Sequence, residues 1–407
     1  MKKMNVLELF AGVGGFRVGL ERANKEFFET KWANQWEPSR KRQDAFECYN
    51  NHFPDSLNFN CDISSLDEDF FRRLQIEGVD MITAGFPCQD YSVASTTGLG
   101  ITGKKGVLFW DLARIIHLTQ PKCFLLENVD RILKSPTKQR GRDFSIILAK
   151  LNQLGYVIEW RVINSAEYGF PQRRIRTFLF GYKIGQKFEK EQEKLSAIDI
   201  LLKKGFFAES FPTTDKLADE KKVATDILSD DLLSISDTYS ANFYSAGIMR
   251  NGRYTTAEVS AEKQQGLSLQ DILLPENEVP DKYYLSEDKV ARFKYLRGSK
   301  KCERTSKDGH TYIYSEGSMS ETDDITNPSR TILTSEGNVN RCSHIINRNN
   351  GRYRLLTPIE CERLDGFSDD WTTGMSDRMR YFCTGNALIT GLVERMGHKI
   401  RAIFENE

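Results

Sequence analysis

The sequence predicts an α/β fold: an open, mostly parallel β-sheet covered by helices on both faces, with a second, smaller irregular lobe. Three observations support this prediction. Apolar strand-like runs alternate with helix-like segments from residue 5 to about 184. The alternation stops near Gly185, and an irregular stretch with many turn residues follows to about 326. Apolar residues at helical spacing from Leu388 to Ile403 then predict an amphipathic C-terminal helix that packs on the core.

Each expected strand is a short apolar run bounded by turn residues. Strands are expected at 5–10, 79–85, 123–127, 156–163 and 177–182, and a short one at 311–314. Helices are expected at 39–53, with Pro38 at its start, and at 108–119 and 143–154. Because an open α/β sheet binds ligands beyond the carboxyl ends of its strands, the residues that follow each strand are the candidates for a site.

Composition sets limits on the class of protein. The 407 residues carry 57 Lys and Arg against 57 Asp and Glu, and this formal charge of zero neither supports nor excludes a nucleic-acid partner. Eight cysteines without any CxxC spacing suggest neither a zinc site nor a redox dithiol, and they fit a reducing cytosol. No apolar run approaches the ~20 residues that span a bilayer. We expect a soluble cytoplasmic protein without a metal.

A glycine-rich loop, Phe10-Ala11-Gly12-Val13-Gly14-Gly15, follows the first expected strand. It matches neither the dinucleotide pattern GxGxxG nor a phosphate loop, so it is either a structural turn or a place where a ligand approaches the backbone. Gln35-Trp36-Glu37 offers a carboxylate for ribose hydroxyls and an indole for an adenine face. Asp62-Ile63 offers a contact to an adenine amino group. Together they predict a nucleoside pocket, although each alone fits surface or core.

Cys88 stands in Gly85-Phe86-Pro87-Cys88, directly after an apolar strand. A lone cysteine is usually a buried apolar residue, but proline before it fits a helix start, where amide dipoles favour a thiolate. Glu127 follows another buried strand and is expected at the same edge of the sheet, unless it only caps a helix. Arg174 and Arg176, two apart in an extended segment, point the same way and either share a target or form a surface ion pair.

These motifs, in this order and rough spacing, resemble the C5-cytosine-specific DNA methyltransferase family, most of all its bacterial type II restriction–modification members. The resemblance rests on the glycine loop, Pro87-Cys88-Gln89, Glu127-Asn128-Val129, Gln172-Arg173-Arg174-Ile175-Arg176, the segment 354–371 and Gly385-Asn386. It implies a doubly wound methyltransferase sheet that binds S-adenosyl-L-methionine, with residues 1–185 as the catalytic domain. Residues 186–330 are then the target-recognition domain, and residues 331–407 return to complete the catalytic domain.

The resemblance also implies roles for single residues. Cys88 attacks C6 of cytosine, Glu127 binds N3 and the amino group, Arg174 holds the base carbonyl, and Arg176 positions the base or Glu127. The implied cofactor-binding residues are Phe10, Ala11, Gly12, Val13, Gly14, Gly15, Trp36, Glu37, Asp62, Ile63, Gly85, Pro87, Leu108 and Asn386. The Gly-, Ser- and Thr-rich stretch 92–106 is expected to close over a flipped base. The family usually carries glutamate where this chain has Gln35, so the ribose contact falls either to Glu37 or to a neutral amide.

The implied function is methylation of a cytosine at C5 within a short specific double-stranded DNA sequence. The enzyme is expected to be a monomer that protects host DNA beside a cognate restriction endonuclease. The alternatives are a tRNA cytosine-C5 methyltransferase of the same fold and a catalytically silent DNA-binding regulator. The basic run 292–307 is either a phosphate-contacting face or a solvated charged surface, and Asn251-Gly252 is expected at a hairpin tip that reads base edges.

Overall fold

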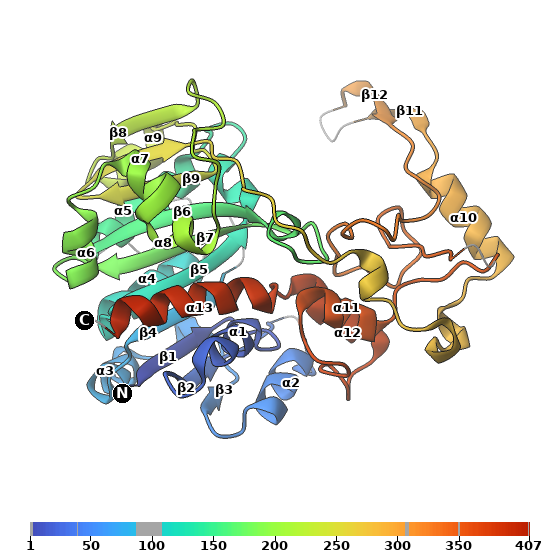
Figure 1. Ribbon diagram of the computed structural model, residues 1–407, viewed down its shortest axis with the longest axis horizontal. Coiled ribbons are helices and arrows are strands. Elements are labelled where there is room, and N and C mark those ends of the chain that lie inside the picture. Colours follow the sequence, from blue (N-terminus) through green and yellow to red (C-terminus); the bar gives the residue numbers. More distant parts are fainter. Residues whose placement is uncertain (1–2, 39, 87–107, 306–308, 349–350, 406) are drawn as a thin grey trace. The chain divides into compact units, whose positions relative to one another are not determined.

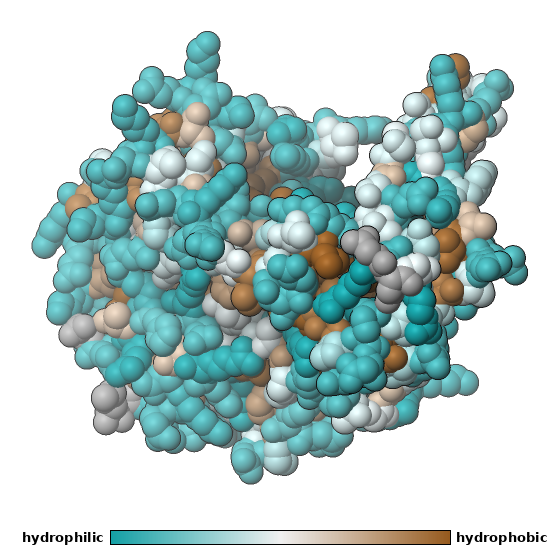
Figure 2. Space-filling view, turned by 45° about the vertical axis from the view of Figure 1, so that its right-hand side comes forward, coloured by the Kyte–Doolittle hydropathy of each residue, from teal (hydrophilic) through white to brown (hydrophobic). Residues whose placement is uncertain are grey.

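The computed structural model describes residues 3–38, 40–86, 108–305, 309–348, 351–405 and 407. The chain divides into two compact units. Unit 1 consists of Met1–Tyr168, Arg174–Gln265 and Ile389–Glu407, and unit 2 consists of Gly169–Arg173 and Gly266–Leu388. Hydrophilic side chains cover most of the face seen in Figure 2, and apolar side chains appear there in small groups.

A ten-stranded sheet forms the centre of unit 1, in the order β3-β2-β1-β4-β5-β7-β6-β9-β10-β8 (Figure 1). The parallel half consists of β1 (Met4–Leu9), β2 (Phe28–Asn34), β3 (Leu57–Phe59), β4 (Met81–Gly85) and β5 (Cys123–Val129). The antiparallel half consists of β6 (Tyr156–Asn164), β7 (Ile175–Lys183), β8 (Val223–Ile227), β9 (Ala246–Arg250) and β10 (Arg253–Ala257). The α/β fold class is confirmed. The sheet is mixed rather than mostly parallel, because β7 turns back beside β5 and every later pairing is antiparallel.

Helices cover both faces of the sheet. On one face α1 (Gly15–Asn24) packs against α13 (Thr390–Phe404), and α13 packs against α8 (Phe206–Ser210) (Figure 1). The other series consists of α3 (Glu68–Glu77), α4 (Leu108–Thr119), α5 (Arg142–Gln153) and α9 (Leu232–Thr238). The apolar side chains of β1, β4 and β5 share one core with those of α4 and α5. The strand ends are therefore held rigidly by a packed interior.

The first and last helices of unit 1 touch almost backbone to backbone. A Cβ on Gly397 of α13 would lie 2.6 Å from the Cβ of Ala23 on α1, and one on Gly19 would lie 2.5 Å from the Cβ of Val393. Only glycine permits so close an approach. The apolar residues of α13 that the sequence places on one face are buried, so the predicted C-terminal helix and its packing are confirmed.

Helix α2 (Asp44–His52) begins five residues after its predicted start at 39. The side chain of Gln43 explains why the helix starts later than predicted. Its Nε2 donates to the carbonyl oxygens of Glu37 and Arg40, and its Oε1 accepts from the amide of Glu37. These bonds hold the segment before Asp44 in a turn instead of a helix.

Residues 186–265 lie in unit 1, whereas the sequence predicts a second lobe from residue 186. This stretch contains α6 (Lys187–Gln192), α7 (Ala197–Asp199), a π-helical turn at Ile200–Lys204, α8, α9 and the strands β8 to β10 that lengthen the sheet. Likewise, only Ile389–Glu407 of the predicted returning segment belongs to unit 1. The first boundary differs from the predicted one because β9 pairs directly with β6.

The Asn251-Gly252 hairpin joins β9 to β10, with φ of 49° and 78° at the two turn residues. Left-handed backbone at both positions is typical of a two-residue hairpin. Arg250 pairs with Glu189 at 3.4 Å, and Tyr254 is buried. The predicted hairpin is therefore present, but these two neighbours are used within unit 1 and not presented for reading bases.

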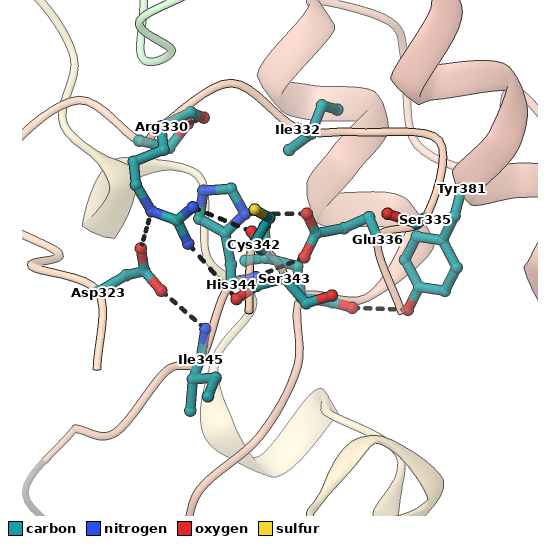
Figure 3. Close-up of polar contacts among 12 residues, drawn as sticks. Asp323, Arg330, Ile332, Ser335, Glu336, Cys342, Ser343, His344, Ile345 and Tyr381 are labelled. Carbon is teal, nitrogen blue, oxygen red and sulfur yellow. Dashed lines mark hydrogen bonds and ion pairs between the residues drawn. The ribbon is translucent and has the colours of Figure 1, made fainter. Parts of the chain in front are cut away.

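Unit 2 contains α10 (Glu287–Arg297), the strands β11 (Lys300–Thr305) and β12 (Thr311–Glu316), α11 (Pro358–Asp365) and α12 (Asp377–Asn386). Its irregular segments are braced by buried ion pairs (Figure 3). Asp323 accepts from Arg330 at 2.7 Å and from the amide of Ile345 at 2.9 Å. The Glu336 carboxylate lies 3.0 Å from Nδ1 of His344, and both side chains are buried. Buried polar contacts of this kind hold loops that carry little regular structure.

Candidate active site

The glycine loop leaves β1 and enters α1 through left-handed backbone. Phe10, Gly12 and Gly14 have φ of 54°, 56° and 93°. The amide of Gly12 donates to Oε1 of Gln35 at 2.8 Å, which ties the loop to the end of β2. A Cβ on Gly12 would meet no atom within 4 Å. The loop therefore leaves open space beside its backbone, as a ligand-binding turn requires.

Gln35 and Glu37, the two candidates for a ribose contact, follow the end of β2 and have different surroundings. Gln35 is buried and engaged with Gly12. Glu37 lies half-buried, with its Oε2 3.6 Å from Nε of Arg40, and burial raises the pKa of its carboxyl group. No hydrogen-bond donor among the described residues reaches this buried oxygen. Within the described residues, Oε2 of Glu37 is therefore ion-paired with Arg40 but accepts no hydrogen bond; Trp36 next to it is half-buried.

Asp62 and Ile63 follow β3. Asp62 Oδ1 accepts from the amide of Ser64 at 2.9 Å and begins a short 3-10 helix, and Ile63 is buried. Leu108 is the half-buried first residue of α4. Asp62 keeps a second carboxylate oxygen, so capping the turn does not prevent a contact to a ligand amino group.

A buried carboxyl group that the sequence reading missed lies under the glycine loop. Glu8 on β1 is fully buried and accepts from the hydroxyl of Tyr49 at 2.9 Å. Burial raises its pKa from the ordinary value of 4.5 to about 7, against the lowering effect of Tyr49 and Arg17. The signal in the sequence is a glutamate inside the apolar run 4–9. The hydrogen bond from Tyr49 links β1 to α2.

Residues 87–107 lie outside the described residues, and this range includes Pro87, Cys88 and the predicted closing loop. The structure describes the chain up to Phe86. Gly85 is the register partner of Glu127 across β4 and β5, and the carbonyl of Phe86 accepts from Nδ2 of the buried Asn128 at 2.8 Å. The strand that leads to Cys88 is therefore bonded to the residue after Glu127.

Glu127 forms the centre of the described polar site. Its Oε1 lies 2.8 Å from Nε of Arg176, and the two side chains are only 15% and 16% exposed. Burial raises the pKa of Glu127, while Arg176 and then Arg174 lower it. The register of β5 with β7 places Arg176 opposite Val129, two residues from Glu127. The sequence left open whether Glu127 faces a site or caps a helix, and in the structure its carboxylate pairs with Arg176.

Arg174 is 1% exposed, and its backbone is fixed by Ser165, whose Oγ accepts from the Arg174 amide at 3.2 Å. Its charge reaches Glu127, since it lowers the pKa of that carboxyl group. The arrangement brings one buried carboxyl and two guanidinium groups together. It can bind a planar polar ring that offers both donors and acceptors.

Other sequence-predicted residues lie in unit 2. Asn386 is exposed at the last position of α12. Within the run 292–307, Arg297 is buried and donates to Asp323 and to the carbonyl of Ser343, so it does not belong to a phosphate-contacting face. Phe293 is buried as well, whereas Arg292, Lys301 and Arg304 are exposed.

The described residues contain neither a metal cluster nor a membrane-spanning helix. No cluster of three or more His, Cys, Asp or Glu side chains there can hold a metal ion. Among the described helices, none combines the length and apolar character needed to cross a membrane.

Known proteins resemble this chain over most of its length. The family model for C-5 cytosine-specific DNA methylase matches residues 4–402. The type II methyltransferase M.Sau3AI of Staphylococcus aureus is 50% identical over 405 residues, which is 99% of this chain and 97% of that protein. M.NlaIV of Neisseria lactamica is 33% identical over 53% of this chain and 50% of its own length.

Solved structures share the fold. The S. pombe Dnmt2 methyltransferase superposes with a TM-score of 0.61 at 14% identity, covering 99% of both chains. A putative DNA modification methyltransferase encoded within a prophage of E. coli superposes with a TM-score of 0.56 at 22% identity, covering 100% of both chains.

Proposed function

The chain belongs to the C-5 cytosine-specific DNA methylase family and is a DNA (cytosine-5-)-methyltransferase, and from this premise we propose its substrate, cofactor and mechanism. It methylates C5 of one cytosine within a short specific sequence of double-stranded DNA, with S-adenosyl-L-methionine as methyl donor. The observation that carries the proposal is the buried Glu127–Arg176 pair beside the strand that leads to Cys88.

Two features of unit 1 fit a nucleoside cofactor: the open space beside Gly12, and a buried Glu37 oxygen that accepts no hydrogen bond from the described residues. Glu37 would accept from the ribose hydroxyls, and Asp62 from the adenine amino group. The remaining proposed cofactor contacts are Phe10, Ala11, Gly12, Val13, Gly14, Gly15, Trp36, Ile63, Gly85, Pro87, Leu108 and Asn386. When bound, the cofactor supplies a methyl group on a positively charged sulfur.

C5 of cytosine is too weak a nucleophile to take that methyl group without help. The Cys88 thiolate adds to C6, which places electron density at C5. C5 then gains the methyl group and loses its proton, and the bond from Cys88 to C6 breaks. The target base must leave the helix to expose C6, at a cost of a few kcal/mol.

Glu127 and the arginines stabilise the base during this addition. Because burial raises the pKa of Glu127, its protonated form persists to higher pH and can donate to N3 while the other oxygen accepts from the amino group. Arg176 orients the Glu127 carboxyl group through the 2.8 Å contact. Arg174 holds the base carbonyl.

The biological setting follows from the relatives, which are named type II methyltransferases. We place the enzyme as a cytoplasmic monomer in a restriction–modification system, where it protects host DNA from an endonuclease that cuts the same sequence.

Expression in a host without cytosine methylation, followed by genome-wide mapping of 5-methylcytosine, tests the proposal and identifies the sequence. Cys88→Ser should abolish methylation and keep cofactor affinity, and the wild type should form a covalent adduct with DNA that carries 5-fluorocytosine. Near-normal turnover by the variant, or no adduct at the mapped sequence, would refute the covalent mechanism.

A further inference from the structure

Strands β11 and β12 form a two-stranded sheet of their own in unit 2 (Figure 1). They pair antiparallel from Lys300 opposite Glu316 to Thr305 opposite Thr311. Apart from Lys300, Tyr314 and Glu316, every residue of the two strands is exposed. We call Lys300–Thr305 with Thr311–Glu316 the ribbon. An isolated two-stranded hairpin is only marginally stable in water, so the ribbon needs contacts with the rest of unit 2.

The base of the ribbon is held by two arginines. The guanidinium group of Arg341 donates to the carbonyl oxygens of Leu296, Gly298 and Gly317 and lies 3.2 Å from Glu316. Arg297, which is buried, donates to Asp323, itself part of the braced network of Figure 3. The ribbon therefore begins and ends on a fixed platform.

The two faces of the ribbon differ in chemistry. On the inner face the guanidinium of Arg304 stacks 3.7 Å above the ring of Tyr314, and Lys300 lies 4.7 Å from the ring centre of Tyr295. The side chains between them point to the opposite, outer face, because neighbours alternate along a strand. Six residues form that outer face, and all are exposed: Lys301, Glu303, Thr305, Thr311, Ile313 and Ser315.

The outer face combines a cation, a carboxylate, three hydroxyl groups and one apolar side chain. Ile313 is 64% exposed and stands opposite Glu303 in the register. An electrostatic surface for phosphates would not carry a carboxylate or an exposed isoleucine. Each of these groups has a partner among base edges: Lys with guanine O6 and N7, Glu with cytosine N4, Ile with the thymine methyl group, and hydroxyls with several.

We propose that the outer face of the ribbon enters the major groove of the target DNA and reads base pairs through Lys301, Glu303 and Ile313. This rests on the proposed function, which supplies DNA as substrate. The major groove, about 12 Å wide, admits a two-stranded ribbon whose strands lie about 4.8 Å apart. Arg304, on the other face, contacts the phosphate backbone. Glu303 repels phosphates and is tolerated only where it accepts from a base, so it specifies cytosine.

The test compares methylation rates of wild type and single variants over a library of DNA sequences that differ at each position of the mapped site. Lys301→Ala, Glu303→Ala and Ile313→Ala should each lose discrimination at one base pair by about 5-fold to 150-fold. Arg304→Ala should slow all sequences alike. Lys289→Ala, an exposed cation of α10 outside the ribbon, is the matched control and should change neither profile nor rate.

All five side chains are exposed, so the variants should keep the unfolding midpoint and cofactor affinity of the wild type. An unchanged sequence profile in the three outer-face variants, or uniform slowing on every sequence, overturns the base-reading role while the methylation by the wild type leaves the proposed function intact. A wild type that methylates no DNA overturns both.

Discussion

The close contact between α1 and α13 can be tested with two substitutions, Gly397→Ala on α13 and Ala23→Gly on α1, made singly and together. In Gly397→Ala the new Cβ would stand 2.6 Å from the Cβ of Ala23, and neither atom can rotate away. The helices must separate by about 1 Å to reach ordinary contact near 3.5 Å. Overpacking of this kind costs about 1–3 kcal/mol, and the gain in helix propensity returns about 1 kcal/mol. We expect a net loss of about 1 kcal/mol.

Ala23→Gly alone loses about 1 kcal/mol of helix propensity and about 0.8 kcal/mol of methyl burial. The double variant Gly397→Ala with Ala23→Gly contains the same number of alanines and glycines as the wild type, and the clash is gone. Its free energy of unfolding should lie within about 1 kcal/mol of the wild-type value. The loss in the double variant is then about 2 kcal/mol smaller than the sum of the losses in the two single variants.

Urea unfolding of the four proteins of this cycle, followed by tryptophan fluorescence and circular dichroism, measures the coupling. The close contact between the two helices is refuted if Gly397→Ala stabilises the protein and the change in unfolding free energy of the double variant equals the sum of the changes in the two single variants.

Three further predictions concern the site. Gln35→Ala removes the acceptor of the Gly12 amide and should weaken S-adenosyl-L-methionine binding about 10-fold in calorimetry, whereas Gln35→Glu keeps an acceptor and should not. Arg176→Gln removes the charge that lowers the pKa of Glu127, so the alkaline limb of the methylation-rate profile should move to higher pH as the maximal rate falls; an unmoved limb contradicts the pairing. Glu8 binds its proton more tightly in the folded protein, so stability falls as pH rises from 4.5 to about 7. Glu8→Gln should abolish a loss of about 3 kcal/mol in the unfolding free energy measured across that range.

Local sequence signals were sufficient where one segment determines its own structure. The expected range 108–119 coincides with α4, and the strands that carry the glycine loop and Glu127 lie within two residues of their predicted bounds. Long apolar runs between turn residues are buried strands whatever surrounds them. For the same reason the sequence alone predicts which motif residues follow the ends of strands.

Pairings between distant segments were not predictable in the same way. Strands β8 and β10 have only five residues each, and they belong to the sheet of unit 1 only because β10 pairs with β9 and β8 pairs with β10. Arg297 stands in a basic run and looks like a surface cation, yet its partner Asp323 lies 26 residues later and draws it inside. The role of Gln35 likewise depends on Gly12, which lies in the loop after β1. Burial of a charge is decided by such partners, which no local pattern contains.

The contact between α1 and α13 also determines when unit 1 can complete its folding during synthesis. Helix α1 leaves the ribosome long before α13, so its apolar face stays uncovered while all the segments between the two helices are made. Unit 2 is translated within that interval and has contacts of its own on which to fold. A chain that stops short of Thr390 leaves Gly19 and Ala23 without a partner. Products that lack α13 should therefore aggregate or be degraded.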